Sequence, residues 1–415
     1  MTRNSIFPLK TQAMADSKEC RPIRVGFLFN HDHLHQIPHV APILAALCEL
    51  NSSMEIHVFV SGKRRSAFLR QLLAPRILSR TAWHPIEAPL IARGLDRLFG
   101  RAVPFERMGI LWRHRRQFAD MDALVVPETT SIFLKTRLGC RNLTLIYTQH
   151  GAGDRAVGFK PSIRYFDHVL VPGPKIRDRM LAEEVIRPGA YSEVGYPKFD
   201  GIDLTSSPRL FPNDNPVVLY NPHCHPGLTS WFLDGLKVME FFRMRSDYNL
   251  VVAPHVMLGA RHLHLSTDPW RLKWRRQIPA KYFRVPHILI DPGSPACVDM
   301  TYTRATDIYL GDVSSQIYEF LLKPKPCIFL NSHKVAWEEN PNYSHWRLGR
   351  VIDEVSSLAP LLRNQDWHDE GLVARQAKAF KATFGSSAKG GALRAARAIH
   401  QVVLTKLDRR SEGSR

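Results

Sequence analysis

At 415 residues the chain is too long for one ordinary hydrophobic core, and at about 150 residues per domain it predicts two or three domains. Its composition, 44% hydrophobic and 10% aromatic, is that of a globular protein, and it contains no run of about 18 apolar residues that would predict a transmembrane helix. Residues 1–22 are polar and lack the apolar core of a signal peptide, so we expect a flexible N-terminal segment and a protein that stays in the cytoplasm. The six cysteines are scattered, as is typical of reduced structural thiols.

The chain continues with a strand, a histidine-rich loop and a helix. Apolar patterning predicts strands at 24–30 and 54–60 with a helix at 40–50 between them, which is the opening βαβ unit of a doubly wound domain. The loop carries three histidines, His31, His33 and His35. Their spacing is loose for a metal site, and no cluster of cysteines or carboxylates accompanies them. We take them as candidates for an acceptor-facing loop, with a metal site and a plain surface loop as the alternatives.

The positive charge is concentrated after this unit. The formal net charge is +19, and between Lys63 and Arg116 thirteen Lys or Arg residues stand against three acids, a net of +10. Apolar residues at helical spacing are interleaved with these cations, which predicts a basic helical stretch suited to anionic lipid or to a polyanionic substrate. We expect no nucleic acid partner, because no recognition motif accompanies the charge. A solvated basic face without a partner is the plain alternative.

The strand ends in the rest of this half point to one catalytic candidate. Strands are predicted at 123–126, 142–147 and 168–171, and the second of them runs into His150-Gly151-Ala152-Gly153. Two glycines directly after a histidine let the backbone approach a ligand while a base faces it. The stretch 206–216 is rich in turn formers, and we place the linker between two domains there.

A second set of alternating elements follows the linker. Strands are predicted at 217–220, 249–253 and 288–290, and the second of them ends at Pro254-His255. The loop after the first strand contains His223-Cys224-His225, whose two imidazoles lie on one side of an extended chain. No third ligand is visible in the sequence, so we predict no metal site.

The clearest unit of the second half is a βαβ unit from 305 to 330. A short apolar run stops at Gly311-Asp312, Ser314 and Ser315 then open a helical segment, and 327–330 restart a strand. Ligands bind at the carboxyl ends of such strands, and a helix start with free N–H groups suits a phosphate. A plain helix cap formed by Asp312 and the serines is the alternative. A last helix is predicted from 370 to 407, with a break near 385–391.

These elements predict an α/β chain of two Rossmann-like, doubly wound domains that face a cleft, closed by a C-terminal helix. The predicted divisions are 1–22 for the N-terminal segment, 23–205 and 216–385 for the two domains, and 386–415 for the C-terminal helix and tail.

An ordered series of motifs resembles the CDP-glycerol glycerophosphotransferase family, whose members build teichoic acids and similar polymers on two-domain GT-B folds. In chain order the motifs are His150-Gly151, Val194 to Asp200, Leu219 to Pro222, Pro254-His255, Asp307 with 312–315, and Lys325-Pro326. The resemblance covers roughly residues 144–362. It implies a GT-B-like fold in which 23–205 is the acceptor and membrane-side domain and 216–385 is the nucleotide-donor domain.

The same resemblance assigns roles to individual residues. It implies that His150 is the base for the acceptor hydroxyl and that His255 helps to neutralise the pyrophosphate. The expected contacts to the donor phosphate or nucleotide are Gly311, Asp312, Ser314, Ser315 and Glu319, and the candidates for further phosphate contacts are Arg155, Lys198 and Arg347. No cofactor or metal is required, because N–H groups and cations can stabilise the leaving group.

The chain departs from the family pattern at Ala253 and Val256 on either side of the Pro-His motif, at Val313 and at 222–225, which leaves the donor open. The expected function is transfer of glycerol phosphate, or a related polyol phosphate, from a CDP-activated donor to a cell-surface glycan or polymer. We expect the enzyme to be peripheral on the inner face of the plasma membrane. The alternatives are a GT-B glycosyltransferase that uses a sugar nucleotide or an enzyme like the UDP-N-acetylglucosamine 2-epimerases, and a non-catalytic protein that binds membranes or polyanions.

Overall fold

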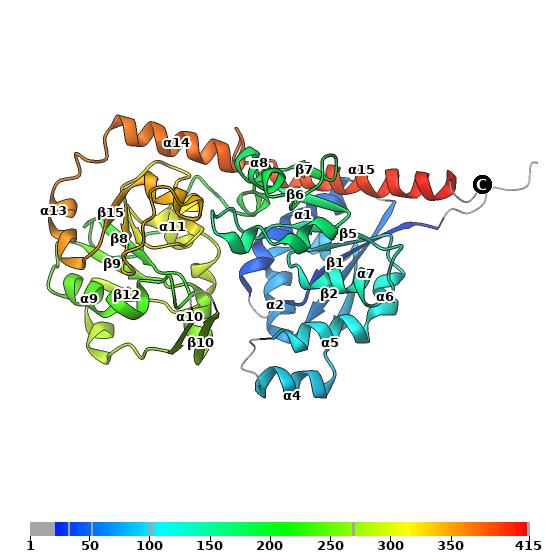
Figure 1. Ribbon diagram of the computed structural model, residues 1–415, viewed down its shortest axis with the longest axis horizontal. Coiled ribbons are helices and arrows are strands. Elements are labelled where there is room, and N and C mark those ends of the chain that lie inside the picture. Colours follow the sequence, from blue (N-terminus) through cyan, green and yellow to red (C-terminus); the bar gives the residue numbers. More distant parts are fainter. Residues whose placement is uncertain (1–20, 32–33, 51–52, 99–102, 268–269, 413–415) are drawn as a thin grey trace, which may run out of the picture.

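The computed structural model describes residues 21–31, 34–50, 53–98, 103–267 and 270–412. Two parallel β-sheets form two domains that lie side by side, the N-terminal one on the right of Figure 1 and the C-terminal one on the left. Consecutive residues along a strand belong to different hydrophobic cores: Phe27 packs in one cluster and Leu28 in another. Both faces of the sheet are therefore buried, which explains why the strands are continuous apolar runs.

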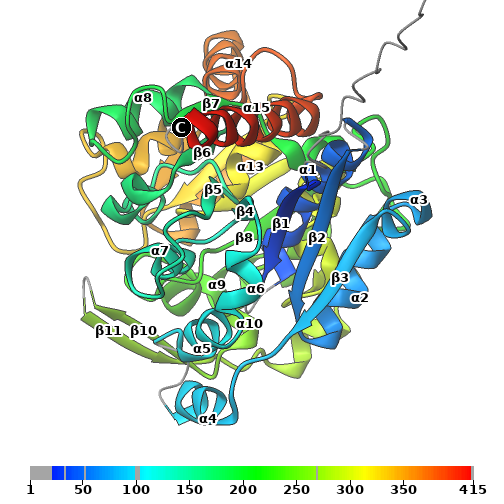
Figure 2. The same cartoon turned by 90° about the vertical axis from the view of Figure 1, so that its right-hand side faces the viewer.

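The N-terminal sheet has seven parallel strands in the order β3-β2-β1-β4-β5-β6-β7. The strands are β1 (Ile23–Phe29), β2 (Met54–Ser61), β3 (Thr81–Ile86), β4 (Ala123–Val126), β5 (Thr144–Thr148), β6 (His168–Val171) and β7 (Tyr191–Glu193). The helices are α1 (Ile37–Leu50), α2 (Lys63–Leu72), α3 (Pro75–Leu78), α4 (Leu90–Leu98), α5 (Phe105–Arg113), α6 (Arg115–Ala119), α7 (Phe133–Thr136) and α8 (Pro174–Ala182), with short 3-10 turns η1 (Leu34–Gln36), η2 (Thr130–Ile132), η3 (Ala156–Gly158), η4 (Pro161–Tyr165) and η5 (Pro197–Gly201). Figure 2 shows the sheet from the side of this domain.

The C-terminal sheet repeats this plan with six parallel strands in the order β12-β9-β8-β13-β14-β15. The strands are β8 (Val217–Asn221), β9 (Asn249–Val252), β12 (Ile288–Ile290), β13 (Ile308–Gly311), β14 (Cys327–Leu330) and β15 (Arg350–Ile352), and a separate antiparallel hairpin is made of β10 (Leu263–Thr267) and β11 (Trp270–Trp274). The helices are α9 (Trp231–Arg243), α10 (Val256–Ala260), α11 (Thr301–Ala305), α12 (Gln316–Phe320) and α13 (Leu358–Arg363), with turns η6 (Ala280–Arg284), η7 (Pro295–Cys297), η8 (Pro341–Leu348) and η9 (Val355–Ser357).

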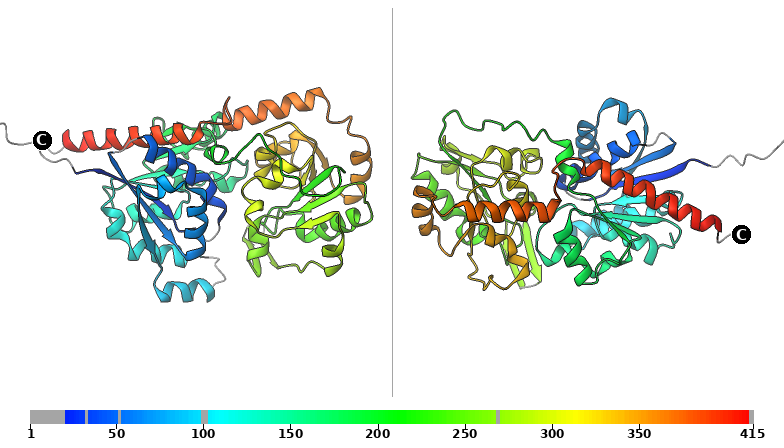
Figure 3. Two further views of the ribbon diagram at one scale, coloured as in Figure 1. Left: turned by 180° about the vertical axis from the view of Figure 1, so that it is seen from behind. Right: turned by 90° about the horizontal axis from the view of Figure 1, so that it is seen from above.

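The last two helices return the chain from the second domain to the first. Helix α14 (Glu370–Phe384) packs on the C-terminal domain, and α15 (Gly391–Glu412) packs along α1 of the N-terminal domain (Figure 3). The chain thus crosses between the domains twice, and the two crossings touch. Asp200 accepts hydrogen bonds from the backbone of Gly390 at 2.6 Å, while the Lys389 ammonium donates to the carbonyls of Phe199 and Ile202.

Most predicted elements are present, and three differences matter. The basic stretch predicted as helical contains the strand β3, whose Pro85 is tolerated because β3 is an edge strand. The β10–β11 hairpin was not predicted at all. The helix expected after Ser315 is α12, which has only five residues. None of the described helices is long and apolar enough to cross a membrane.

Candidate active site

The carboxyl ends of the two sheets face each other across the domain boundary. In each sheet the strand order reverses at one place, between β1 and β4 and between β8 and β13, and in open α/β sheets ligands bind at that place. In the first sheet the loops after β1 and β5 carry the predicted histidines His31, His35 and His150. In the second sheet the loops after β8, β9 and β13 carry His223, His255 and the two serines. Parallel pairing sets these loops at one end of each sheet, and the contact between the domains brings the loops of the two sheets together.

Five imidazoles from both domains form a chain that we call the histidine cluster. Its members are His31, His35 and His150 from the N-terminal domain, and His223 and His255 from the C-terminal domain. The ring centroids of His35 lie 5.5 Å from those of His150 and 5.8 Å from those of His255, so His35 bridges the two catalytic candidates. His31 lies 5.2 Å from His35. The predicted residue His33 falls outside the described residues.

His150 is held in the tautomer that a general base needs. Its Nδ1 lies 2.8 Å from the carbonyl oxygen of Pro127, which can only accept, so Nδ1 carries the proton and Nε2 presents the lone pair. Burial lowers the pKa of His150, although the hydrogen bond to Pro127 opposes this shift. The ring is therefore neutral near neutral pH. The side-chain amide of Gln36 donates to this Nε2 at 3.3 Å, so an acceptor hydroxyl would have to take the place of the amide.

A pocket of about 550 Å³ adjoins the cluster and is lined by both domains. His35 forms part of its wall, next to three cations at the start of α2, Lys63, Arg64 and Arg65. The opposite wall comes from α10 and from the loop after β12, which includes Asp291 and Ser294. A pocket of this size accepts a nucleotide-sized ligand, and its cations favour a negatively charged one.

Arg155 directs its positive charge into the cluster. Its Nη1 lies 2.9 Å from Nε2 and 3.0 Å from Nδ1 of His223, and no carboxylate among the described residues lies within ion-pair distance of it. Burial, reinforced by the charge of Arg155, holds the pKa of His223 well below its usual range. A half-buried guanidinium beside a neutral imidazole is a ready partner for a phosphate oxygen.

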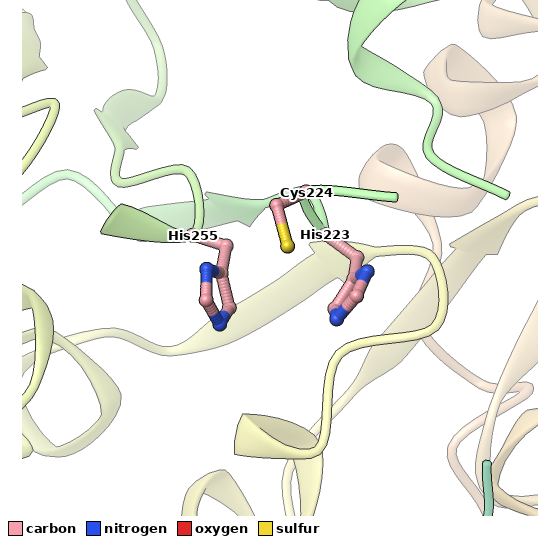
Figure 4. Close-up of side chains that lie close together, drawn as sticks. All are labelled: His223, Cys224 and His255. Atoms are coloured by element: carbon pink, nitrogen blue, oxygen red, sulfur yellow. The ribbon is translucent and has the colours of Figure 1, made fainter. Parts of the chain in front are cut away.

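His223, Cys224 and His255 are the group among the described residues whose chemistry suits a metal ion. One ligand atom of each lies within 4.8 Å of the other two, and Figure 4 shows the three side chains converging. Nitrogen and sulfur ligands of this kind suit zinc, but a tetrahedral ion would hold its ligand atoms about 3.3–3.6 Å apart. Burial also raises the pKa of the Cys224 thiol to about 11.

The surroundings of these three side chains favour an anion over a cation. The ring of His223 faces the Arg155 guanidinium on one side, and its Nδ1 accepts from the backbone N–H of His225 at 3.1 Å. A neutral imidazole has one lone pair, so a bound metal would have to displace these donors and sit beside a guanidinium. The absence of a metal stays a prediction.

The residues of the predicted donor loop after β13 differ in burial and in what they contact. The Asp312 carboxylate is fully buried and accepts from the backbone of His223 and Ser230 at 2.8 and 2.7 Å, so it shapes the loop that carries His223. Gly311 lies within the sheet, where the Tyr309 ring fills the space that a Cβ would need. Ser314 is also buried, whereas Ser315 is exposed.

Ser315 lies directly against the glycine-rich loop of the other domain. A Cβ added to Gly153 would lie 2.8 Å from the Cβ of Ser315, and one added to Gly151 would lie 3.4 Å from its hydroxyl oxygen. Real Cβ atoms do not approach as closely as 2.8 Å, so the contact needs a glycine at 153, whereas the distance at Gly151 is an ordinary van der Waals contact. The His-Gly and Ser-Ser motifs of the sequence therefore meet at one point of the cleft.

Three further predicted residues lie apart from the cluster. Lys198 and Glu319 form a buried ion pair across the boundary, with Nζ 2.7 Å from Oε1, and the Tyr196 hydroxyl donates to the same carboxylate. Each of these two charges is therefore already neutralised by the other within the protein. Arg347 is exposed and donates to the carbonyl of Glu338. Any contact of these three with a phosphate stays a prediction that the geometry does not favour.

Sequence reasoning missed a second buried group at the boundary, which we call the Asp154 network. Asp154 accepts from Lys175 at 2.7 Å, from the Tyr318 hydroxyl at 2.6 Å and from both the backbone and the ring of His345 at 3.1 Å. Burial alone would raise the pKa of Asp154, but the His345 hydrogen bond and the Lys175 charge hold it well below its usual range. The one available signal was an aspartate directly after a His-Gly-x-Gly loop.

The comparisons with known proteins give a fold but no family. No family profile and no curated protein matches the chain by sequence. The wall teichoic acid polymerase TagF superposes with a TM-score of 0.59 at 14% identity, over 93% of this chain and 90% of that chain. A putative UDP-N-acetylglucosamine 2-epimerase from Listeria monocytogenes gives 0.57 at 15%, over 89% and 94%. The glycotransferase of kitacinnamycin gives 0.57 at 12%, over 92% and 99%.

Identities this low show the fold alone. They confirm the predicted α/β architecture of two Rossmann-like domains in a GT-B arrangement. The same fold serves proteins described as a polymerase, an epimerase and a glycotransferase, so the reaction has to be argued from the residues of the site.

Proposed function

We propose that this protein is a GT-B transferase that moves glycerol phosphate, or a related polyol phosphate, from a CDP-activated donor to a cell-surface glycan or polymer. The observation that carries the proposal is the meeting of His150 and His255 through His35, beside a two-domain pocket lined with cations. The similarity of fold to the TagF polymerase, which was also solved with CDPG, supports this donor class.

His150 is the proposed general base. Its Nε2 takes the proton of the acceptor hydroxyl while the hydroxyl oxygen attacks the β-phosphorus of the donor. The bond between the β-phosphorus and the bridging oxygen breaks, and CMP leaves with the electron pair. In this proposal Arg155 and His255 neutralise the negative charge that builds on the pyrophosphate, and the hydroxyl of the exposed Ser315 contributes a hydrogen bond at the domain contact.

Two roles predicted from the sequence, that of Asp312 and that of the basic segment, are changed in this proposal. Asp312 positions the loop of His223 and does not itself contact the donor. Lys63, Arg64 and Arg65 belong to the basic segment assigned to the membrane, but they line the pocket and serve a phosphate of the donor or of a polyanionic acceptor. The remainder of 63–116, around α4 to α6, is the part proposed to meet an anionic membrane surface on the cytoplasmic side.

A glycosyltransferase that uses a sugar nucleotide is the second candidate. The fold matches the putative epimerase and the kitacinnamycin glycotransferase as well as it matches TagF. A neutral imidazole in a cationic cleft would serve either chemistry. The two candidates differ in the nucleotide that is released.

The deciding experiment offers CDP-glycerol, CDP-ribitol and UDP-sugars separately to the purified protein with a membrane fraction as acceptor. We expect release of CMP and transfer of labelled glycerol or ribitol phosphate. Release of UDP, or formation of an epimerised UDP-sugar, would replace the proposal with the second candidate. If no nucleotide is consumed and neither cytidine nor uridine diphosphate raises the melting temperature, both enzymatic assignments fail and a non-catalytic binding protein is left.

A further inference from the structure

In the β10–β11 hairpin the polar face is turned inward and the apolar face is turned outward. Its inward-facing positions are polar: His264 and Ser266 are buried against the domain, and Ser266 bonds to His225. Its outward face is apolar, because Trp270, Leu272 and Trp274 alternate along β11 and Leu265 pairs with Leu272. Trp270 and Trp274 are 65% and 72% exposed. A water-soluble hairpin normally shows the opposite polarity.

Helix α4 of the other domain is inverted in the same way. At helical spacing Leu90, Ile91, Leu95 and Leu98 share one face, yet Leu90 is 81% and Ile91 is 79% exposed. The charged side chain of Asp96, on the opposite face, is buried and accepts from the backbone of Glu106. The fold therefore turns the polar side of the helix inward and leaves its apolar side uncovered.

These two elements lie near each other although they belong to different domains. Both sit at the lower edge of the molecule in Figure 1, on either side of the domain boundary, and they are neighbours again in Figure 2. Trp112, on the adjoining helix α5, is also exposed. Exposed apolar patches rimmed by polar groups mark interaction surfaces. Together these side chains form one such patch, which extends over both domains.

The charges around the patch identify the kind of partner. Exposed cations lie on the same elements or next to them: Arg97 on α4, Arg113 and Arg116 on α5 and α6, Arg271 on β11 and Arg275 directly after it. The segment 261–276 holds five cations and one acid, so the hairpin is basic as well as apolar. Tryptophan and leucine interleaved with arginine and lysine suit the headgroup layer of an anionic bilayer, where rings enter the interface and cations meet lipid phosphates.

We infer that the outward faces of α4 and of the β10–β11 hairpin together dock this protein on an anionic lipid surface. The inference extends the proposed membrane contact of the 63–116 segment to the C-terminal domain, which the basic segment does not reach. It rests on that part of the proposed function but not on the reaction. With an anchor on each domain, the bilayer would hold both walls of the cleft next to a membrane-bound acceptor.

Vesicle flotation with the full-length protein tests the inference. The vesicles are phosphatidylcholine alone or phosphatidylcholine with phosphatidylglycerol, at low and at high salt. The hairpin variant is Trp270→Ser with Trp274→Ser, the helix variant is Leu90→Ser with Ile91→Ser, and the matched control is Leu404→Ser on α15, at the opposite edge of the molecule. Circular dichroism melts check that each variant is folded.

We expect the wild type and the control to bind the anionic vesicles, and each pair of substitutions to weaken binding by at least about tenfold. High salt should weaken binding further, since part of the attraction is electrostatic. A hairpin variant that binds as tightly as the wild type overturns the inference. So does a dimer of the free protein that dissociates only in the variants, because a second copy would then cover the face.

The vesicle result is independent of the reaction. Release of CMP with a short soluble acceptor should be equal in the wild type and in both variants, since neither pair lines the cleft. A wild type that binds vesicles but consumes no CDP-donor would disprove the proposed transfer and leave the docking surface standing.

Discussion

The two polar groups at the domain boundary are built on opposite principles. In the Asp154 network one carboxylate oxygen accepts from Lys175 of the N-terminal domain, the other accepts from Tyr318 and His345 of the C-terminal domain, and the carboxylate itself is buried. Beside the histidine cluster, the amide of Asn30 is 2% exposed and neither its nitrogen nor its oxygen has a partner among the described residues. A fully satisfied network fixes a geometry, whereas unpaired buried groups mark a place where another molecule supplies the partners. The Asp154 network thus sets the distance between the domains, and the geometry of the histidine cluster depends on that distance.

The sharpest test of this difference is His150→Ala. Removing the proposed base should lower the rate of transfer by about 10²–10⁴-fold, while the free energy of unfolding changes little, because the ring makes few bonds. Nucleotide release and chemical denaturation measure the two quantities. His84→Gln, on the edge strand β3, serves as the matched control. It should leave the rate of transfer unchanged and lower the free energy of unfolding slightly, because the His84 ring bonds to His57 and stacks on Phe59. Full activity in His150→Ala would show that another residue is the general base.

Asp154→Asn should show the reverse pattern. Breaking a buried ion pair by removing one partner costs about 3–5 kcal/mol of unfolding free energy, and activity should fall only as the folded fraction falls. Because the folded-state pKa of Asp154 lies below its unfolded value, its stabilisation is present above the unfolded pKa, near about 3.9, and is lost as the pH falls from there. The variant should therefore lose less stability than the wild type on acidification. Equal acid sensitivity in the two proteins would contradict this assignment.

Arg155→Gln distinguishes a cation aimed at a ligand from one that is merely on the surface. Loss of a charged hydrogen bond to the donor should cost about 1.5–3 kcal/mol, which corresponds to about 10- to 100-fold in KM for the donor. Arg347→Gln is the matched control, because this side chain is exposed and outside the cluster, and its effect should stay within about 0.5 kcal/mol. The assignment is wrong if the two substitutions have equal effects on KM.

Gly153→Ala tests the contact that joins the two domains at the cleft. The new methyl group would lie 2.8 Å from the Cβ of Ser315, so the loops must separate, at a cost of about 1–3 kcal/mol in stability or in transfer. Ser315→Gly in the same chain should restore part of the stability by making room. Gly158→Ala is the control, because its Cβ would meet Gln149 at an ordinary 3.8 Å. An unchanged Gly153→Ala protein would show that the contact is loose.

The sequence predicted the architecture because the buried strands are continuous apolar runs with turn formers between them. It failed at β3 and at the hairpin for a physical reason. Both are short: β3 contains Pro85 and lies in a basic stretch, and β11 contains Arg271 and Lys273. Only pairing with a neighbouring strand makes these segments extended. The break between α14 and α15 was predicted correctly, since Gly385 takes a φ of 86° that suits glycine.

For the site, the residues at strand ends could be predicted and their partners could not. His35, His150 and His255 follow strands whose carboxyl ends meet in any doubly wound pair of domains. The bonds of Lys198 to Glu319 and of Asp154 to His345 join residues 121 and 191 positions apart, and no local pattern specifies such pairs. Lys198 and Glu319 were predicted as contacts to the donor, and in the structure they bond to each other.

The two chain crossings have a mechanical consequence. Lys389 and Asp200 tie them together, so they act as one hinge and not as two independent tethers. A rotation about this hinge changes the separation of the domains least beside α15 and most at the far edge, where α4 and the β10–β11 hairpin lie (Figure 1). The widest opening of the cleft would then occur at the lipid surface, so that a lipid-linked acceptor could enter while the hinge side stays closed.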